Sequence, residues 1–113
     1  GKTPEFHTGA DLSAVTGTPV YAAASGVVRI ARNAASSGNY VRLLNLGGDE
    51  TIYAHLQYLF VRQGQQIQAG QCLGTVGQTG NATGPHLHFE LLHAGVRYDP
   101  TRALAKAGLQ AEP

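Results

Sequence analysis

The chain has 113 residues and a formal net charge of +1, and only 13% of its residues are Asp, Glu, Lys or Arg, where about 25% is usual. This size predicts one small globular domain, and the single cysteine excludes a disulfide framework or a zinc site built on cysteine pairs. The scattered arginines argue against a nucleic-acid-binding module, and no apolar run of about 20 residues could span a membrane. Because methionine is absent, we expect the chain to be a piece excised from a longer protein.

Short apolar segments of strand length recur along the chain, and glycines separate most of them. This spacing predicts an all-β sandwich or barrel. Near the end, 101–107 follows Asp99-Pro100 and is predicted to be one short C-terminal helix that ends before Gly108. The predicted strands are Val20–Ala24, Val27–Ala31, Tyr40–Leu46, Thr51–Leu56, Leu73–Val76 and Leu87–Leu92.

A faint internal repeat accompanies these strands. The segments 17–22 and 64–69 both fit the pattern Gly-x-x-Val/Ile-x-Ala, and each leads through a glycine into an apolar strand. Six positions can agree by chance, so duplication and coincidence stay open as equal alternatives. If the repeat is real, two similar β-units pack face to face.

The segment His86–Leu91 reads His-Leu-His-Phe-Glu-Leu. Side chains alternate along a strand, so His86, His88 and Glu90 share one face while the apolar residues between them enter the core. Two adjacent imidazoles are favourable if a metal keeps at least one of them neutral. A lone His-x-His also occurs without a metal, and Glu90 is either an orienting partner of an imidazole or a structural surface carboxylate.

Two further histidines are candidates for the same site. His7 and Asp11 are separated by a segment that contains Gly9, which favours a loop or strand end for His7 and a strand start for Asp11. Together with one histidine of the later pair they would complete the three protein ligands of a catalytic zinc site. His55 ends an apolar strand and is either a core histidine bonded to backbone or a catalytic group.

Three motifs in order resemble the zinc endopeptidases of the lysostaphin/LytM type, which hydrolyse peptide bonds in bacterial peptidoglycan. They are Phe6-His7-Thr-Gly-Ala-Asp11, Tyr53-Ala-His55-Leu56, and the segment from Thr79 to Glu90 that contains Thr-Gly-Pro-His-Leu-His. The resemblance extends from His7 to about Pro100. It implies a duplicated β-sandwich, or barrel-sandwich hybrid, around a central groove, with 1–113 as a single peptidase domain and a core of about 6–100.

The resemblance also assigns roles to residues. It implies one Zn²⁺ held by His7, Asp11 and His88, with His55 and His86 catalytic and their division into acid and base open. It implies a monomer that acts on stem or cross-bridge peptides of peptidoglycan in the periplasm or outside the cell, at the cell wall. Some relatives add an upstream tyrosine, which this chain lacks before Tyr21. Tyr53 is a candidate replacement, and the candidates for the substrate groove are Tyr53, Asn81 and Thr83.

Two other functions stay open. Some members of the family lack ligands and act as catalytically silent regulatory modules that activate other cell-wall hydrolases, and a structural envelope domain could bind the same peptides. All five expected functional positions are present here, which favours the enzyme. The motifs do not choose between oligoglycine bridges and direct D-alanyl–diaminopimelate cross-links.

Overall fold

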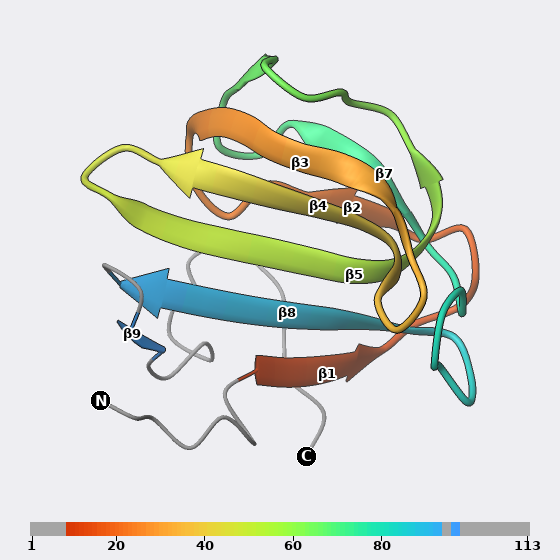
Figure 1. Cartoon of the computed structure of the whole chain (residues 1–113). Coiled ribbons are helices and arrows are strands. Elements are labelled where there is room, and N and C mark those ends of the chain that lie inside the picture. Colours follow the sequence, from red (N-terminus) through yellow and green to blue (C-terminus); the bar gives the residue numbers. More distant parts are fainter. Residues whose placement is uncertain (1–8, 94–95, 98–113) are drawn as a thin grey trace.

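The computed structural model describes residues 9–93 and 96–97, and these residues form nine antiparallel strands and no helix (Figure 1). The all-β prediction is therefore confirmed, while the predicted helix at 101–107 lies outside the described residues. No helix within them is long and apolar enough to cross a membrane. The strands are β1 Gly9–Ser13, β2 Pro19–Tyr21, β3 Gly26–Ala34, β4 Gly38–Asn45, β5 Asp49–Leu59, β6 Gln66–Ile67, β7 Cys72–Val76, β8 His86–His93 and β9 Val96–Arg97.

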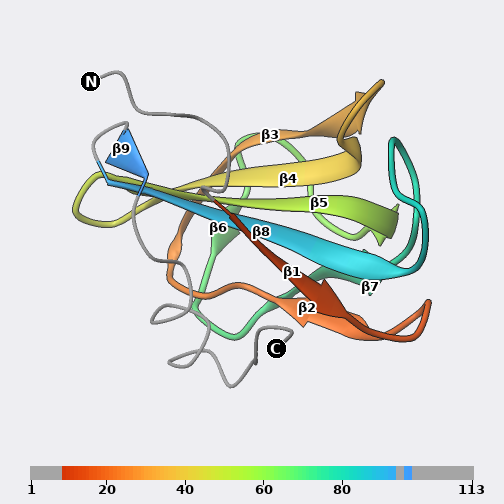
Figure 2. The same cartoon turned by 90° about the horizontal axis from the view of Figure 1, so that it is seen from below.

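The strand order is β1-β8-β5-β4-β3-β6, with β9 on β8 and with β2 and β7 attached through β5. Figures 1 and 2 show β3, β4, β5, β8 and β1 side by side. Strand β5 has two partners along its length: residues 49–54 pair with β8, and residues 56–59 pair with β7. The exchange occurs at His55, so this histidine stands where the sheet divides.

The two segments of the sequence repeat occupy equivalent places. Gly17 and Gly64 both have positive φ angles of about 90–96°, and Val20 and Ile67 are both buried. The pairing is reciprocal, because β2 pairs with β7, which follows the second repeat, and β6 pairs with β3, which follows the first. This exchange is what two similar β-units packed on each other would produce.

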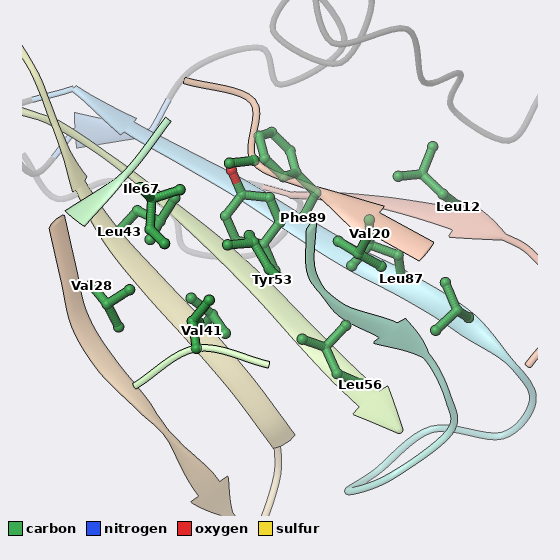
Figure 3. Close-up of a cluster of buried hydrophobic side chains, with 14 of the residues drawn as sticks. Leu12, Val20, Val28, Val41, Leu43, Tyr53, Leu56, Ile67, Leu87 and Phe89 are labelled. Carbon is green, nitrogen blue, oxygen red and sulfur yellow. The ribbon is translucent and has the colours of Figure 1, made fainter. Parts of the chain in front are cut away.

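The core fills the inner face of the sheet. On β8 the alternation predicted from sequence holds, since Leu87, Phe89 and Leu91 are buried while His86, His88 and Glu90 are half-buried on the opposite face. The rings of Tyr53 and Phe89 meet edge to face with centroids 5.3 Å apart (Figure 3). Each large side chain removed from water contributes about 2–3 kcal/mol, so this packing holds β8 against β5.

Tyr53 differs from its predicted role. Its side chain is fully buried, the phenol donates to Thr51 Oγ1 (3.0 Å), and the phenol oxygen accepts the Ala23 N–H (2.9 Å). Burial also raises the pKa of this phenol. The prediction that Tyr53 lines a substrate groove or replaces the upstream tyrosine therefore does not hold, because its hydroxyl is committed to the core.

The predicted strand bounds are close to the observed ones except where pairing extends a strand. Strand β5 continues past its predicted end at Leu56 because β7 supplies new partners. The chain from Ala22 to Ala24 leaves the strand conformation. The strand start expected at Asp11 falls inside β1, which begins two residues earlier at Gly9. Strands β6 and β9 were not predicted, since each is short and carries too few alternating apolar residues to be recognised.

Candidate active site

Asp11 and the histidine pair meet through strand register. Asp11 on β1 lies opposite His88 on β8, and Ala54 on β5 lies opposite the other side of His88. The side chains of His86 and His88 are 21% and 28% exposed and that of Asp11 is 64% exposed. The face opposite the core thus gathers groups that are 77 residues apart in the chain.

His88 is held between two carboxylates. Its Nδ1 lies 2.7 Å from Asp11 Oδ1, and its Nε2 lies 2.9 Å from Glu90 Oε2. The hydrogen bond to Glu90, supported by the hydrogen bond and charge of Asp11, raises the pKa of His88 despite partial burial. A metal ion would bind His88 at Nδ1 and displace the proton there, because a ring nitrogen ligates a metal only when it carries no proton.

His86 is held through its Nδ1 nitrogen. Its Nδ1 lies 2.9 Å from the carbonyl oxygen of Gly84, and since a carbonyl only accepts, Nδ1 carries the hydrogen. Its Nε2 lies 3.6 Å from Asp11 Oδ1, which is beyond hydrogen-bond distance. Nε2 of the neutral ring is therefore the nitrogen able to accept a proton.

His55 is oriented in the same way. Its Nδ1 donates to the carbonyl oxygen of Thr79 at 2.7 Å, and its backbone N–H donates to Ser37 O at 2.8 Å. Burial lowers the pKa of His55; the bond to Thr79 opposes this, and positive charge on His86 or His88 lowers the pKa further. Burial thus favours the neutral form of the ring, and the bond to Thr79 places the lone pair of that form on Nε2.

The three imidazoles form one cluster. The ring centroid of His55 lies 4.9 Å from that of His86 and 6.2 Å from that of His88. Among residues 9–93 and 96–97 no three His, Cys, Asp or Glu side chains are grouped to hold a metal ion, and His7, the expected third ligand, lies outside these residues. Asp11 and His88 nevertheless offer one oxygen and one nitrogen donor, the mixture that suits zinc.

Comparison with known proteins identifies the family of this chain. The sequence profile of peptidase family M23 matches residues 5–100. The chain belongs to peptidase family M23.

Individual relatives of this M23 domain cover most of it. The peptidoglycan DD-endopeptidase ShyC of Vibrio cholerae is 43% identical over 94 residues, which are 83% of this chain and 22% of the relative. The solved catalytic domain of lysostaphin from Staphylococcus simulans has a TM-score of 0.80 and 34% identity, with 88% of this chain and 79% of that one covered. A solved zinc-containing peptidase from Vibrio cholerae has a TM-score of 0.79 and 38% identity, covering 82% of this chain and 29% of that one. The chain spans about a fifth of the length of curated relatives such as ShyC.

The loop between β7 and β8 borders the histidines of the M23 domain. Asn81 and Thr83 are exposed on this loop, and their place in a substrate groove stays a prediction. Sequence reasoning did not anticipate Asn39, whose amide donates to the carbonyl oxygens of Leu56 and Gln57, both at 3.1 Å, beside His55. No local pattern indicates that role, because Asn39 occurs before a predicted strand as turn asparagines commonly do.

His93 and Glu90 both lie on β8 and have different surroundings. His93 ends β8 with its side chain 63% exposed and bonded to Asp49, as expected of a surface histidine. Glu90 was left open between two roles, and its contact with His88 Nε2 is that of an orienting partner. A bond of this kind fixes which ring nitrogen faces a metal.

Proposed function

We propose that this M23 domain is a zinc-dependent endopeptidase that hydrolyses peptide cross-links or bridges of bacterial peptidoglycan. The observation that carries the proposal is the assignment of ring nitrogens in the cluster. His88 turns Nδ1 to Asp11 while Glu90 holds its Nε2, whereas His55 and His86 are both held through Nδ1. This difference supports His88 as a ligand and His55 and His86 as proton carriers.

The metal would be held by His7, Asp11 and His88, one zinc ion in one chain. Bound zinc supplies two things, polarisation of the scissile carbonyl and a lowered pKa of an attacking water. Asp11 supplies a carboxylate oxygen and His88 its Nδ1, and Glu90 keeps the imidazole from turning. Because all proposed ligands belong to one chain, a monomer is sufficient.

Proton transfer would be carried out by His55 and His86. Each has its Nδ1–H committed to a backbone carbonyl, so each takes or gives a proton at Nε2. One imidazole accepts the proton of the attacking water, and the other donates to the leaving amine or to the developing oxyanion. A well-placed general acid or base contributes about 10²–10⁴-fold to rate.

The substrate and the place of action follow from the named relatives. ShyC is named a peptidoglycan DD-endopeptidase, which supports direct D-alanyl–diaminopimelate cross-links over oligoglycine bridges. Peptidoglycan lies outside the cytoplasmic membrane, so the domain would act in the periplasm or outside the cell, at the cell wall.

The proposal is tested with purified protein on two kinds of sacculi, one with direct cross-links and one with glycine bridges. We expect one zinc per chain by metal analysis and, by mass spectrometry, fragments with a new diaminopimelate amine from the first wall. Release of glycine-ended fragments alone would overturn the substrate assignment. A protein without zinc and without turnover on either wall would overturn the enzyme and favour the silent regulatory module.

A further inference from the structure

His55 has a backbone conformation that needs external support. Its φ is +65°, and within residues 9–93 and 96–97 it is the one non-glycine residue with positive φ. Side chains other than that of glycine rarely adopt this region, and such residues persist where surrounding structure holds them. The conformation occurs where β5 passes from β8 to β7, so it decides where the imidazole points.

Thr79 supports this backbone conformation of His55 with both its hydroxyl and its carbonyl group. Its hydroxyl donates to the carbonyl oxygen of Leu56 at 2.8 Å and accepts the N–H of Asn39 at 3.0 Å. Its own carbonyl oxygen accepts the Nδ1–H of His55 at 2.7 Å. One residue therefore fixes the backbone immediately after His55 and the ring of His55 itself.

The position of Thr79 is in turn set by close packing. A Cβ on Gly38 would lie 2.4 Å from the Thr79 carbonyl carbon, and a Cβ on Gly80 would lie 2.3 Å from the Gly38 nitrogen. The Asn81 N–H also donates to Ser36 O at 2.9 Å. The 77–85 loop and the turn between β3 and β4 thus touch backbone to backbone, which leaves the Thr79 carbonyl little room to move.

We infer that Thr79 is a positioning residue for His55, and that its hydroxyl keeps the imidazole in the Nδ1–H form with Nε2 free. The inference rests on the proposed function only in giving His55 the task of proton transfer. Loss of the hydroxyl leaves the Leu56 carbonyl and the Asn39 N–H without this partner. The backbone after His55 is then held less firmly against the 77–85 loop, so the imidazole moves away from the Thr79 carbonyl and both ring tautomers become populated.

The test compares Thr79→Val with Thr79→Ser, which keeps the hydroxyl, and with Thr75→Val as a matched control. The Thr75 hydroxyl donates to Gln57 Oε1 (3.2 Å) on a half-buried strand and has no bond to the His55 backbone or ring. The zinc-loaded proteins are measured by ¹⁵N NMR of the histidine rings and by kcat and KM on peptidoglycan fragments. Should the valine variant fail to fold, Thr79→Ala removes the same hydroxyl and carries the same expectation.

We expect Thr79→Val to move the Nδ1 and Nε2 resonances of His55 towards the average of two tautomers and to lower kcat about 10–100-fold, with KM nearly unchanged. Thr79→Ser should restore both readouts, and Thr75→Val should alter neither. Wild-type His55 resonances in Thr79→Val, or a serine variant that behaves like valine, would overturn the inference. If the parent protein has no turnover, the proposed function fails, while the NMR comparison still decides the role of Thr79.

Discussion

The three imidazoles of the cluster are held through different ring nitrogens. Glu90 holds Nε2 of His88, so Nδ1 faces Asp11, whereas the Gly84 and Thr79 carbonyls hold Nδ1 of His86 and His55. Because a ring nitrogen bonded to a carbonyl must carry hydrogen, the two backbone carbonyls select the tautomers of His55 and His86. The same residue type can therefore present different ring nitrogens within one cluster.

At the residue scale, the first prediction tests whether His88 is a zinc ligand. His88→Ala removes one of the proposed donors, so we expect loss of stoichiometric zinc, measured by metal analysis of protein purified in buffered zinc. His93→Ala on the same strand is the control, because His93 is exposed and bonded to Asp49, and it should retain one zinc. Full zinc content in His88→Ala would refute the assignment.

The second residue-scale prediction concerns His86. His86→Ala removes a proposed proton carrier whose Nε2 is not within hydrogen-bond distance of Asp11, so zinc should remain bound. Digestion of purified sacculi should fall by about 10²–10⁴-fold. Metal content and release of soluble fragments are measured on the same preparation, and normal digestion would show that the two histidines of the pair are wrongly divided.

At the scale of elements, the contact between the β3–β4 turn and the 77–85 loop is the joint that supports His55. Gly80 has φ +74° and its added Cβ would meet the Gly38 nitrogen at 2.3 Å, whereas Gly47 has φ +92° and open space around it. Both alanine substitutions bear the cost of positive φ, roughly 1–2 kcal/mol. Gly80→Ala should lose a further 1–3 kcal/mol, roughly, because of the overlap.

This difference is measured by urea denaturation of the two variants, with an unchanged dependence on denaturant concentration as the check that both unfold alike. Equal losses of unfolding free energy would mean that the loop moves away without cost. In that case the joint would not be rigid, and the support of His55 would have to come from β5 itself.

A cross-strand ion cluster links β3, β4 and β5. Glu50, whose side chain is 12% exposed, bonds Arg42 and also Arg29 at 2.7 Å. Burial opposes ionisation of Glu50, but the hydrogen bonds and charges of the two arginines outweigh it, so its pKa lies below the ordinary 4.5. The cluster therefore stabilises the fold at pH values where Glu50 is charged.

Glu50→Gln tests the sign of this effect. Since the folded pKa is depressed, the stabilisation is fully present above about pH 4.5 and is lost as the pH falls through the lower folded value. We expect the variant to unfold about 1 kcal/mol more easily at pH 7, with the difference from wild type vanishing in acid. Urea midpoints across this range measure it, and a difference independent of pH would contradict the prediction.

At the scale of the whole molecule, one sheet separates the core from the histidine cluster. Phe89, which lies between His88 and Glu90 in the sequence, is fully buried and packs on Tyr53. Phe89→Ala should reduce the unfolding free energy by about 3–5 kcal/mol, because a cavity opens in a close-packed interior. Phe60→Ala is the control, since Phe60 is 56% exposed, and chemical denaturation of both variants measures the contrast. Similar losses in the two variants would show that the core is not centred on β8.

Much of this arrangement was predictable from local sequence. The alternation in His86–Leu91 determines which side chains enter the core, because successive residues of a strand point to opposite faces. Six strands and the all-β class follow from apolar runs and glycines, and the resemblance of three motifs identified the family. The nature of the candidate ligands was also visible, since histidine and aspartate are the donors present.

What only the tertiary structure decided depends on contacts between distant segments. The register that sets Asp11 opposite His88, the burial of Tyr53, and the change of partner at His55 have no local signature. The same is true of the hydrogen on each imidazole, which depends on the Thr79 and Gly84 carbonyls and on Glu90. The sequence by itself determined that His86, His88 and Glu90 share one face, because that is a property of one strand. The fold decided how each is held, because hydrogen-bond partners and positive φ are set by segments that meet only when the sheet closes.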